Sequence, residues 1–221
     1  MSNSYFLFSL FLLQLFLFSF EDMKAQTNDN IIWASMKLHT SLGDKTTLAI
    51  APTLRLNDDI SDYQNMSIDI SLKQKLSKNW SVQLLERTWF IPNGTNRQFL
   101  WLDLIYGRAF GNIHISSGLR YHYAFDIKES VDSDFFRWKT IFSLLNLGRI
   151  KPFIGIEPWF QTNKIGDFRN IRYIAGLNYK LNEQLGLGLK YWRQETMNLE
   201  PSRDFNIYLM TLSYKLISKK N

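Results

Sequence analysis

The stretch that decides the fold runs from Ile113 to Ile127 and reads Ile-His-Ile-Ser-Ser-Gly-Leu-Arg-Tyr-His-Tyr-Ala-Phe-Asp-Ile. Its odd positions are mostly apolar, whereas its even positions carry the polar residues His114, Ser116, Arg120, His122 and Asp126. Successive side chains of a β-strand point to opposite faces, so this period of two predicts a strand with one apolar and one polar face. Strands of soluble domains usually have about five or six residues. This strand is therefore long enough to suit a membrane.

Similar alternation recurs along the chain, and it predicts eleven candidate strands. A tilted strand needs roughly 9–11 residues to cross the hydrocarbon layer of a bilayer, and each candidate is at least that long. The pattern favours an all-β fold, a closed antiparallel transmembrane β-barrel of ten to twelve strands. The candidate strands are 31–42, 46–56, 65–76, 80–91, 97–110, 113–127, 135–147, 150–162, 169–181, 184–194 and 203–216.

The connections between these strands alternate between short and long. Outer-membrane barrels have short periplasmic turns and longer external loops, so this alternation predicts the orientation of the barrel. With eleven strands, the first strand would then begin on the external side. Single-chain bacterial barrels, however, have even strand numbers. Either residues 31–42 do not span, which leaves ten strands, or one break is misplaced and there are twelve. The short turns are 43–45, 77–79, 111–112, 148–149 and 182–183, and the longer links are 57–64, 92–96, 128–134, 163–168 and 195–202.

Residues 1–25 are expected to be a cleaved signal peptide, and residues 26–221 the barrel domain. Phe6 to Phe20 is an apolar run that is too short to cross a bilayer as a helix, which needs about 20 residues. Cleavage is expected after Ala25, and the alternative is an N-terminal membrane anchor. Export would place the mature protein in the outer membrane of a Gram-negative cell, in contact with outer-membrane lipid and, through its fold class, with the barrel-assembly machinery.

Composition narrows the class of protein further. The net charge is +6 and becomes about +7 without Glu21, Asp22 and Lys24 of the leader, but the basic residues are spread along the chain and do not indicate nucleic acid. There is no cysteine, so neither a disulfide nor a lipidated N-terminal cysteine is possible. No cofactor or metal motif is present. Aromatic residues near strand ends are expected to form interfacial girdles: Trp80, Trp89, Phe90, Phe110, Phe136, Trp138, Trp159, Phe160, Tyr191, Trp192 and Tyr214.

Several runs resemble an uncharacterised bacterial family of small outer-membrane β-barrels, domain-of-unknown-function family 2490. They are Gly-Leu-Arg-Tyr at 118–121, Pro-Phe-Ile-Gly-Ile-Glu at 152–157, Arg-Tyr-Ile-Ala-Gly-Leu-Asn-Tyr-Lys-Leu at 172–181 and Leu-Gly-Leu-Lys-Tyr at 187–191. The resemblance extends from Trp33 to Leu216 and implies a barrel fold and an outer-membrane location, but no activity. Barrels of this class often end on an aromatic residue, whereas here Ile-Ser-Lys-Lys-Asn follows Leu216.

The polar faces of the strands predict a charged lumen. We expect a lumen polar network, either structural or selective for solutes, of Arg120, His122, Asp126, Glu157, Arg172 and Lys190. Because an unpaired charge in a low dielectric is costly, Glu157 is expected to pair with Arg172 or Arg120. Further inward positions are Asp69, Lys73, Lys180 and one of Arg137 and Lys139.

Two features break the simple pattern. His114 and Ser116 form a His-x-Ser pair like that of lipid A deacylases, in which a His activates a Ser nucleophile. Here the pair follows a tight turn, is expected to face the lumen, and has no evident carboxylate beside it, so coincidence is the favoured interpretation. Glu86 and Arg87 interrupt the alternation of their strand, which predicts a β-bulge at 84–85 or a charge facing lipid.

The sequence therefore predicts a small outer-membrane barrel with no catalytic residues, serving envelope structure or the passage or binding of a small solute. The first alternative is a lipid-modifying enzyme that uses His114 and Ser116. The second is a soluble exported barrel that binds a lipophilic ligand with its faces reversed. Alternation shows that the two faces of a strand differ, but not which face is outside. Tyr123 outside and Arg120 inside would favour the membrane barrel, and the reverse would favour this second alternative.

Overall fold

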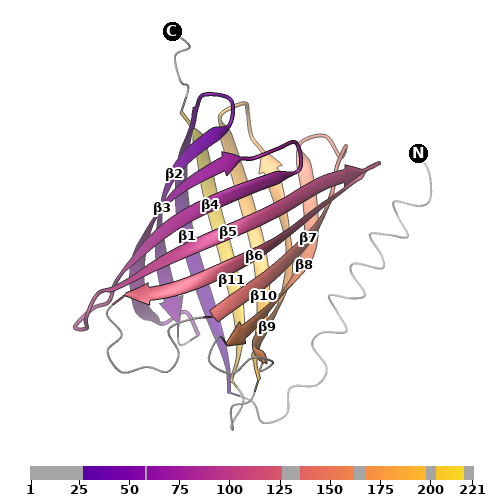
Figure 1. Cartoon of the computed structure of the whole chain (residues 1–221). Coiled ribbons are helices and arrows are strands. Elements are labelled where there is room, and N and C mark those ends of the chain that lie inside the picture. The colour runs from indigo at the N-terminus through magenta and orange to yellow at the C-terminus, as the bar shows by residue number, and fades with distance from the viewer. Residues whose placement is uncertain (1–26, 58, 126–134, 162–167, 198–202, 217–221) are drawn as a thin grey trace, which may run out of the picture.

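The computed structural model describes residues 27–57, 59–125, 135–161, 168–197 and 203–216, which form eleven β-strands (Figure 1). Among these residues, no helix is long and apolar enough to cross a membrane. The predicted leader, residues 1–25, lies outside the described residues. The strands are β1 (Thr27–Leu42), β2 (Thr46–Asn57), β3 (Asp62–Lys75), β4 (Trp80–Phe90), β5 (Arg97–Phe110), β6 (Ile113–Phe125), β7 (Phe135–Leu144), β8 (Ile150–Gln161), β9 (Phe168–Lys180), β10 (Leu185–Thr196) and β11 (Arg203–Lys215).

The strands close into one barrel, which confirms the predicted all-β, closed-barrel fold. Each strand pairs antiparallel with its sequence neighbour, and β1 closes the barrel by pairing in parallel with β11, from Thr27 opposite Arg203 to His39 opposite Lys215. The barrel is therefore mixed and not wholly antiparallel. The choice between ten and twelve strands was wrong, because residues 31–42 are a full barrel strand. An up-and-down barrel with an odd number of strands must close with one parallel pair.

The parallel pair fixes where the chain starts. Because β1 and β11 run in the same direction, β1 begins at the barrel end where β11 begins, which is the end of the longer connections (Figure 1). The lengths of the connections alternate less clearly than expected, since β3 begins at Asp62 and the β2–β3 connection, 58–61, is shorter than the β7–β8 turn, 145–149.

Three of the tight turns contain a glycine whose backbone φ is positive: Gly43, Gly111 and Gly148. Residues with a Cβ rarely adopt this conformation, which is why these turns use glycine.

The apolar face of the strands points outward. Tyr123 is 42% exposed and Leu177 is 36% exposed, whereas Arg172 is only 5% exposed inside the barrel. Many outward side chains are large and apolar, including Leu102, Leu104, Leu119, Ile154 and Met210. The barrel thus has the predicted orientation, with its apolar surface outside and its ionic side chains enclosed.

The predicted aromatic girdles are only partly observed. Trp80, Phe110, Phe136, Trp138 and Tyr214 are exposed outside the barrel. In contrast, Trp159 and Trp192 are buried, and Trp89 packs against the interior cluster of Leu85, Phe99, Trp101 and Ala124. These three tryptophans were misplaced because strand ends mark positions near an interface but do not say which face a ring occupies.

The predicted bulge at 84–85 is absent. β4 pairs with β3 and β5 in unbroken register through these residues, so Arg87 points inward and Glu86 points outward. On the outer face, the Thr88 hydroxyl donates a hydrogen bond to Glu86 Oε1 at 2.7 Å, which satisfies part of this carboxylate. Register shifts occur elsewhere, between Arg55 and Leu56 and between Trp159 and Phe160, near the end of the longer connections.

Candidate functional site

Arginine and tryptophan side chains from different strands meet in the lumen. The guanidinium of Arg55 on β2 lies 4.3 Å from the Trp33 ring centroid and 4.8 Å from that of Trp89. Similar cation–π contacts continue around the wall, so the residues form one set, which we call the arginine–tryptophan layer. Its members are Arg55, Arg87, Arg120, Arg137 and Arg172 with Trp33, Trp89, Trp101, Trp159 and Trp192.

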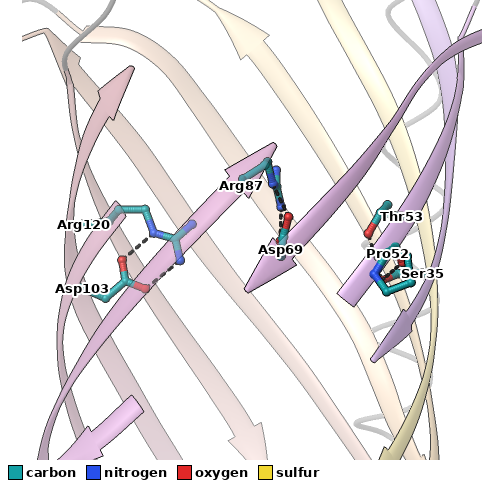
Figure 2. Close-up of polar contacts among 7 residues, drawn as sticks. All are labelled: Ser35, Pro52, Thr53, Asp69, Arg87, Asp103 and Arg120. Carbon is teal, nitrogen blue, oxygen red and sulfur yellow. Dashed lines mark hydrogen bonds and ion pairs between the residues drawn. The ribbon is translucent and has the colours of Figure 1, made fainter. Parts of the chain in front are cut away.

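Two arginines of this layer are held in bidentate ion pairs across neighbouring strands (Figure 2). Arg87 donates from Nε and Nη2 to both oxygens of Asp69, each at 2.6 Å. Arg120 donates from Nε at 2.5 Å and from Nη2 at 2.7 Å to the two oxygens of Asp103. The planar fork of a guanidinium matches a carboxylate in this way, so both arginines are fixed and their charges neutralised.

The third ion pair is the one that the sequence predicted. Arg172 Nη1 donates to Glu157 Oε2 at 3.1 Å, and Arg172 Nη2 donates to the side-chain oxygen of Gln194. Both members of the pair are 5% exposed. Arg172 also lies 4.8 Å from the Trp159 ring centroid and 4.5 Å from that of Trp192, so it links β8, β9 and β10.

Arg55 and Arg137 differ from the other three arginines. They are 2% and 8% exposed, respectively, and within the described residues neither forms an ion pair or a hydrogen bond through its side chain. Arg137 instead lies over aromatic rings, with its guanidinium 3.7 Å from the Trp159 centroid and 4.9 Å from that of Phe135. A cation–π contact contributes about 0.5–2 kcal/mol and supplies no acceptor for an N–H group. These buried cations are thus only partly stabilised.

Lysines add to the positive charge of the lumen. Lys37, Lys73, Lys139 and Lys190 occupy inward positions of β1, β3, β7 and β10, and none has an ion pair in the part of the chain that the structure describes. Lys190 lies close enough to Lys139 and Lys37 for mutual repulsion. Among the described residues, these four lysines and the five arginines of the layer make nine cations, against the three carboxylates that pair with the layer, Asp69, Asp103 and Glu157, an excess of six.

The predicted lumen network is present in part. Arg120, His122, Glu157, Arg172 and Lys190 all point inward, but Arg120 pairs with Asp103 and not with Glu157. Both Arg137 and Lys139 face the lumen, although the sequence was read as placing only one there. Asp126 lies outside the described residues. The buried His122 ring packs against Phe99, Trp101 and Phe135.

Sequence reasoning missed Asp103, because its strand does not alternate cleanly. It also missed Arg55, although β2 does alternate and places Arg55 on the face opposite Leu48, Ile50 and Leu54. On β5 the inward side chains before Asp103 are Phe99 and Trp101, so both faces are apolar there and the strand's polar face is not evident. The signal that could have found Asp103 is a single carboxylate between Leu102 and Leu104 in an otherwise apolar strand. Such a residue needs a buried cationic partner.

His114 and Ser116 both face the lumen, near the tight turn that joins β5 to β6. Neither forms a hydrogen bond to the other or to a carboxylate among the residues described. Residues in these positions do not make a nucleophile, base and orienting acid. The described residues also contain no group of three or more His, Asp or Glu side chains placed to hold a metal ion.

An ion pair also joins the last residue of β9 to the turn between β9 and β10. Lys180 Nζ donates to Glu183 Oε1 at 2.6 Å, and this hydrogen bond holds the pKa of the Glu183 carboxyl below its ordinary value. Both side chains are largely exposed to solvent. The pair therefore has little bearing on the lumen, but it provides an exposed counterpart to the buried pair of Glu157 and Arg172.

Comparison with known proteins places this geometry in a family. No curated protein and no solved structure matches the chain significantly. A family model described as a protein of unknown function (DUF2490) matches residues 30–204, which include most of the barrel and all members of the arginine–tryptophan layer. This eleven-stranded barrel with its cationic lumen thus belongs to the DUF2490 family.

Proposed function

We propose that the mature protein is an outer-membrane barrel that binds small anionic solutes in its lumen and catalyses no reaction. One observation carries this proposal: the barrel is apolar outside and strongly cationic inside. An exposed apolar surface of this kind is the face that a membrane barrel presents to lipid. An enclosed surface with an excess of positive charge is the face that an anion-binding or anion-selective channel presents to its solute.

The outer surface supports the membrane location. Leu102, Leu104, Leu119 and Met210 are each between 45% and 52% exposed, and they belong to strands on different sides of the barrel. Soluble monomers rarely expose apolar surface so widely. A soluble barrel for a lipophilic ligand is disfavoured for the complementary reason. Its interior would be apolar, whereas this interior encloses the charges of Arg87, Arg120 and Arg172.

The filled lumen supports binding, or slow passage, and not free diffusion. Barrels of about eight strands have interiors that side chains fill, and those with 16–18 strands leave an aqueous channel. This barrel has eleven, and its arginine–tryptophan layer crosses the interior. A solute that reaches the layer meets guanidinium and ammonium groups, so small anions are favoured over cations.

Envelope fractionation tests the location. The expected result is that the protein is found in the outer-membrane fraction and that the unheated, folded form migrates faster on a denaturing gel than the heated form. Recovery from the soluble periplasmic fraction would refute the membrane proposal. Separation of a signal peptide, expected after Ala25, is checked by the mass of the purified protein.

Reversal potentials across planar bilayers test the lumen. With a potassium chloride gradient, we expect the sign of the potential to report anion preference, and we expect Lys190→Glu to weaken that preference. Lys78→Glu is the matched control, because Lys78 is an exposed residue of the tight turn between β3 and β4 and lies on no strand. A cation-selective wild-type barrel would contradict the proposal. If the barrel showed no conductance at all, the passage of solutes would be refuted, and only their binding in the lumen would stay proposed.

The proposed absence of catalysis is tested through Ser116. If the barrel hydrolysed lipid A or phospholipid acyl chains, Ser116 would be the nucleophile and His114 the base. We expect purified wild-type protein and Ser116→Ala to release no fatty acid from either lipid. Release by the wild type that is lost in Ser116→Ala would overturn this part of the proposal.

A further inference from the structure

One wall of the lumen, around Glu157, carries an excess of positive charge. Around Glu157 lie four cations, Arg172, Lys139, Arg137 and Arg120. Arg120 is already neutralised by its bidentate pair with Asp103. That leaves Glu157 as the one carboxylate, in the described part of this wall, for the other three cations.

The cations on this wall surround two tryptophan rings. Arg137 lies 3.7 Å from the centroid of Trp159, and Lys139 Nζ lies 6.0 Å from that of Trp192, while Arg172 lies between both rings. Several donors at these positions have no acceptor among the described residues: Arg137 Nε, Arg172 Nε and the indole N–H groups of Trp159 and Trp192.

Lys190 extends this group toward the end of the barrel that carries the tight turns. It is near Lys139, and the next inward positions on the same strand are Gly188 and Gly186. No bulky β10 side chain therefore separates Lys190 from that end. Lys37, which also faces inward on this side, is exposed to solvent. Lys190, which is itself partly exposed, is thus the member of this group nearest to that end.

We propose that Arg137, Lys139 and Lys190 form a binding site for a soluble tetrahedral oxyanion, either inorganic phosphate or a phosphate monoester. The charge balance favours this class. Arg137, Lys139, Arg172 and Lys190 carry four positive charges against one on Glu157, so three are unmatched. Phosphate carries about −1.5 to −2 charges at neutral pH and several strong acceptor oxygens, whereas a monocarboxylate would match only one cation. The inference rests on the proposed anion-binding function and specifies its ligand.

Phosphate titration of the folded barrel in detergent tests the site. The probe is inorganic phosphate at constant ionic strength, with chloride as the reference anion, and the readout is intrinsic fluorescence, since Trp159 and Trp192 line the site. We expect a saturable change with phosphate only. We expect Lys139→Met with Lys190→Met to weaken binding at least about tenfold, as loss of charge-assisted hydrogen bonds implies. Lys78→Met, in the exposed turn between β3 and β4, should bind as the wild type does.

Other outcomes would overturn the site. They are an identical response to phosphate and chloride, unchanged affinity in the double variant, or an equal loss in Lys78→Met. Should the double variant not fold, as judged by its heat-modified mobility, Lys190→Met alone replaces it, because this residue has no ion pair to lose among those described.

Competition identifies the source of the phosphate group. Displacement of phosphate by glycerol phosphate supports a monoester ligand, and failure of glycerol phosphate to compete restricts the site to inorganic phosphate. Displacement by phosphatidylglycerol micelles alone would refute a lumen site. Because the assay uses detergent, it does not depend on where the protein resides in the cell. Anion selectivity in bilayers without phosphate binding would refute this inference and leave the proposed function intact.

Discussion

Removing the carboxylate of Glu157 should destabilise the barrel more than removing any exposed charge. Glu157→Gln preserves size but leaves Arg172 buried without its anionic partner, and the side chains of both residues are only 6% exposed. Loss of one member of a buried pair destabilises a protein by about 3–5 kcal/mol. Arg172 retains its bond to Gln194 and its contacts with two rings. We therefore expect the lower end of the range, about 3 kcal/mol.

Equilibrium urea unfolding in detergent or lipid, followed by tryptophan fluorescence, measures this loss. The matched control is Glu183→Gln, the same substitution in the exposed pair with Lys180, which should leave the unfolding midpoint unchanged. Arg172→Gln and the double variant complete a cycle, and the double variant should be more stable than Glu157→Gln because neither member of the pair is left buried as an unpartnered charge. A loss below about 1 kcal/mol in folded Glu157→Gln would refute the claim that this pair sits in a low dielectric.

Three further predictions follow from the packing, the outer face and the oxyanion site. Gly155→Ala should destabilise the barrel in the same urea assay, because its new Cβ would lie 2.4 Å from Ile141 Cδ1. Gly118→Ala, whose new Cβ would have nearest contacts of 3.4 Å, should have little effect. Equal effects of the two substitutions would contradict this packing. Leu102→Arg should lower stability in lipid by about 2–4 kcal/mol if this exposed side chain faces the bilayer midplane, and no loss in lipid would count against the membrane location. Glu157→Gln should bind inorganic phosphate more tightly than the wild type, since it removes the negative charge that competes for the same cations, and weaker binding would oppose the proposed site.

Alternation in the sequence was sufficient to predict the strands and which side chains share a face. The run from Ile113 to Phe125 is β6 with its polar residues on one face, as the period of two required, whereas the inward direction of that face was inferred from the length of the strands and the charge of the face. Strand number was harder to judge, because the even-number rule assumes that the chain begins and ends on one side of the membrane. That assumption fails here, since β1 is parallel to β11. Nothing local in residues 31–42 reveals the direction of a partner strand that lies at the other end of the chain.

The candidate site was predictable where charge partners lie on adjacent strands. Glu157 and Arg172 are direct cross-strand neighbours over one hairpin, so counting from the turn brings them together. Arg137 and Trp159 are also register neighbours, but the predicted role of the tryptophan as an interface anchor concealed that contact. Contacts across the lumen depend on barrel closure and on which long side chains meet in the middle. Sequence spacing does not contain this information.

In this barrel the arginines that help to fill the lumen also give it its positive charge. A lumen of eleven strands is too wide for small side chains to fill, and the apolar clusters, such as Phe153 with Ile174 and Trp192, occupy only part of it. Arginines stacked on tryptophans fill the remainder, and each brings a full positive charge and several N–H donors. Filling by arginine therefore creates an excess of donors that three carboxylates cannot satisfy. In the function proposed above, an anion that enters the lumen supplies the missing acceptors, so packing and the proposed anion binding follow from the same choice of side chain.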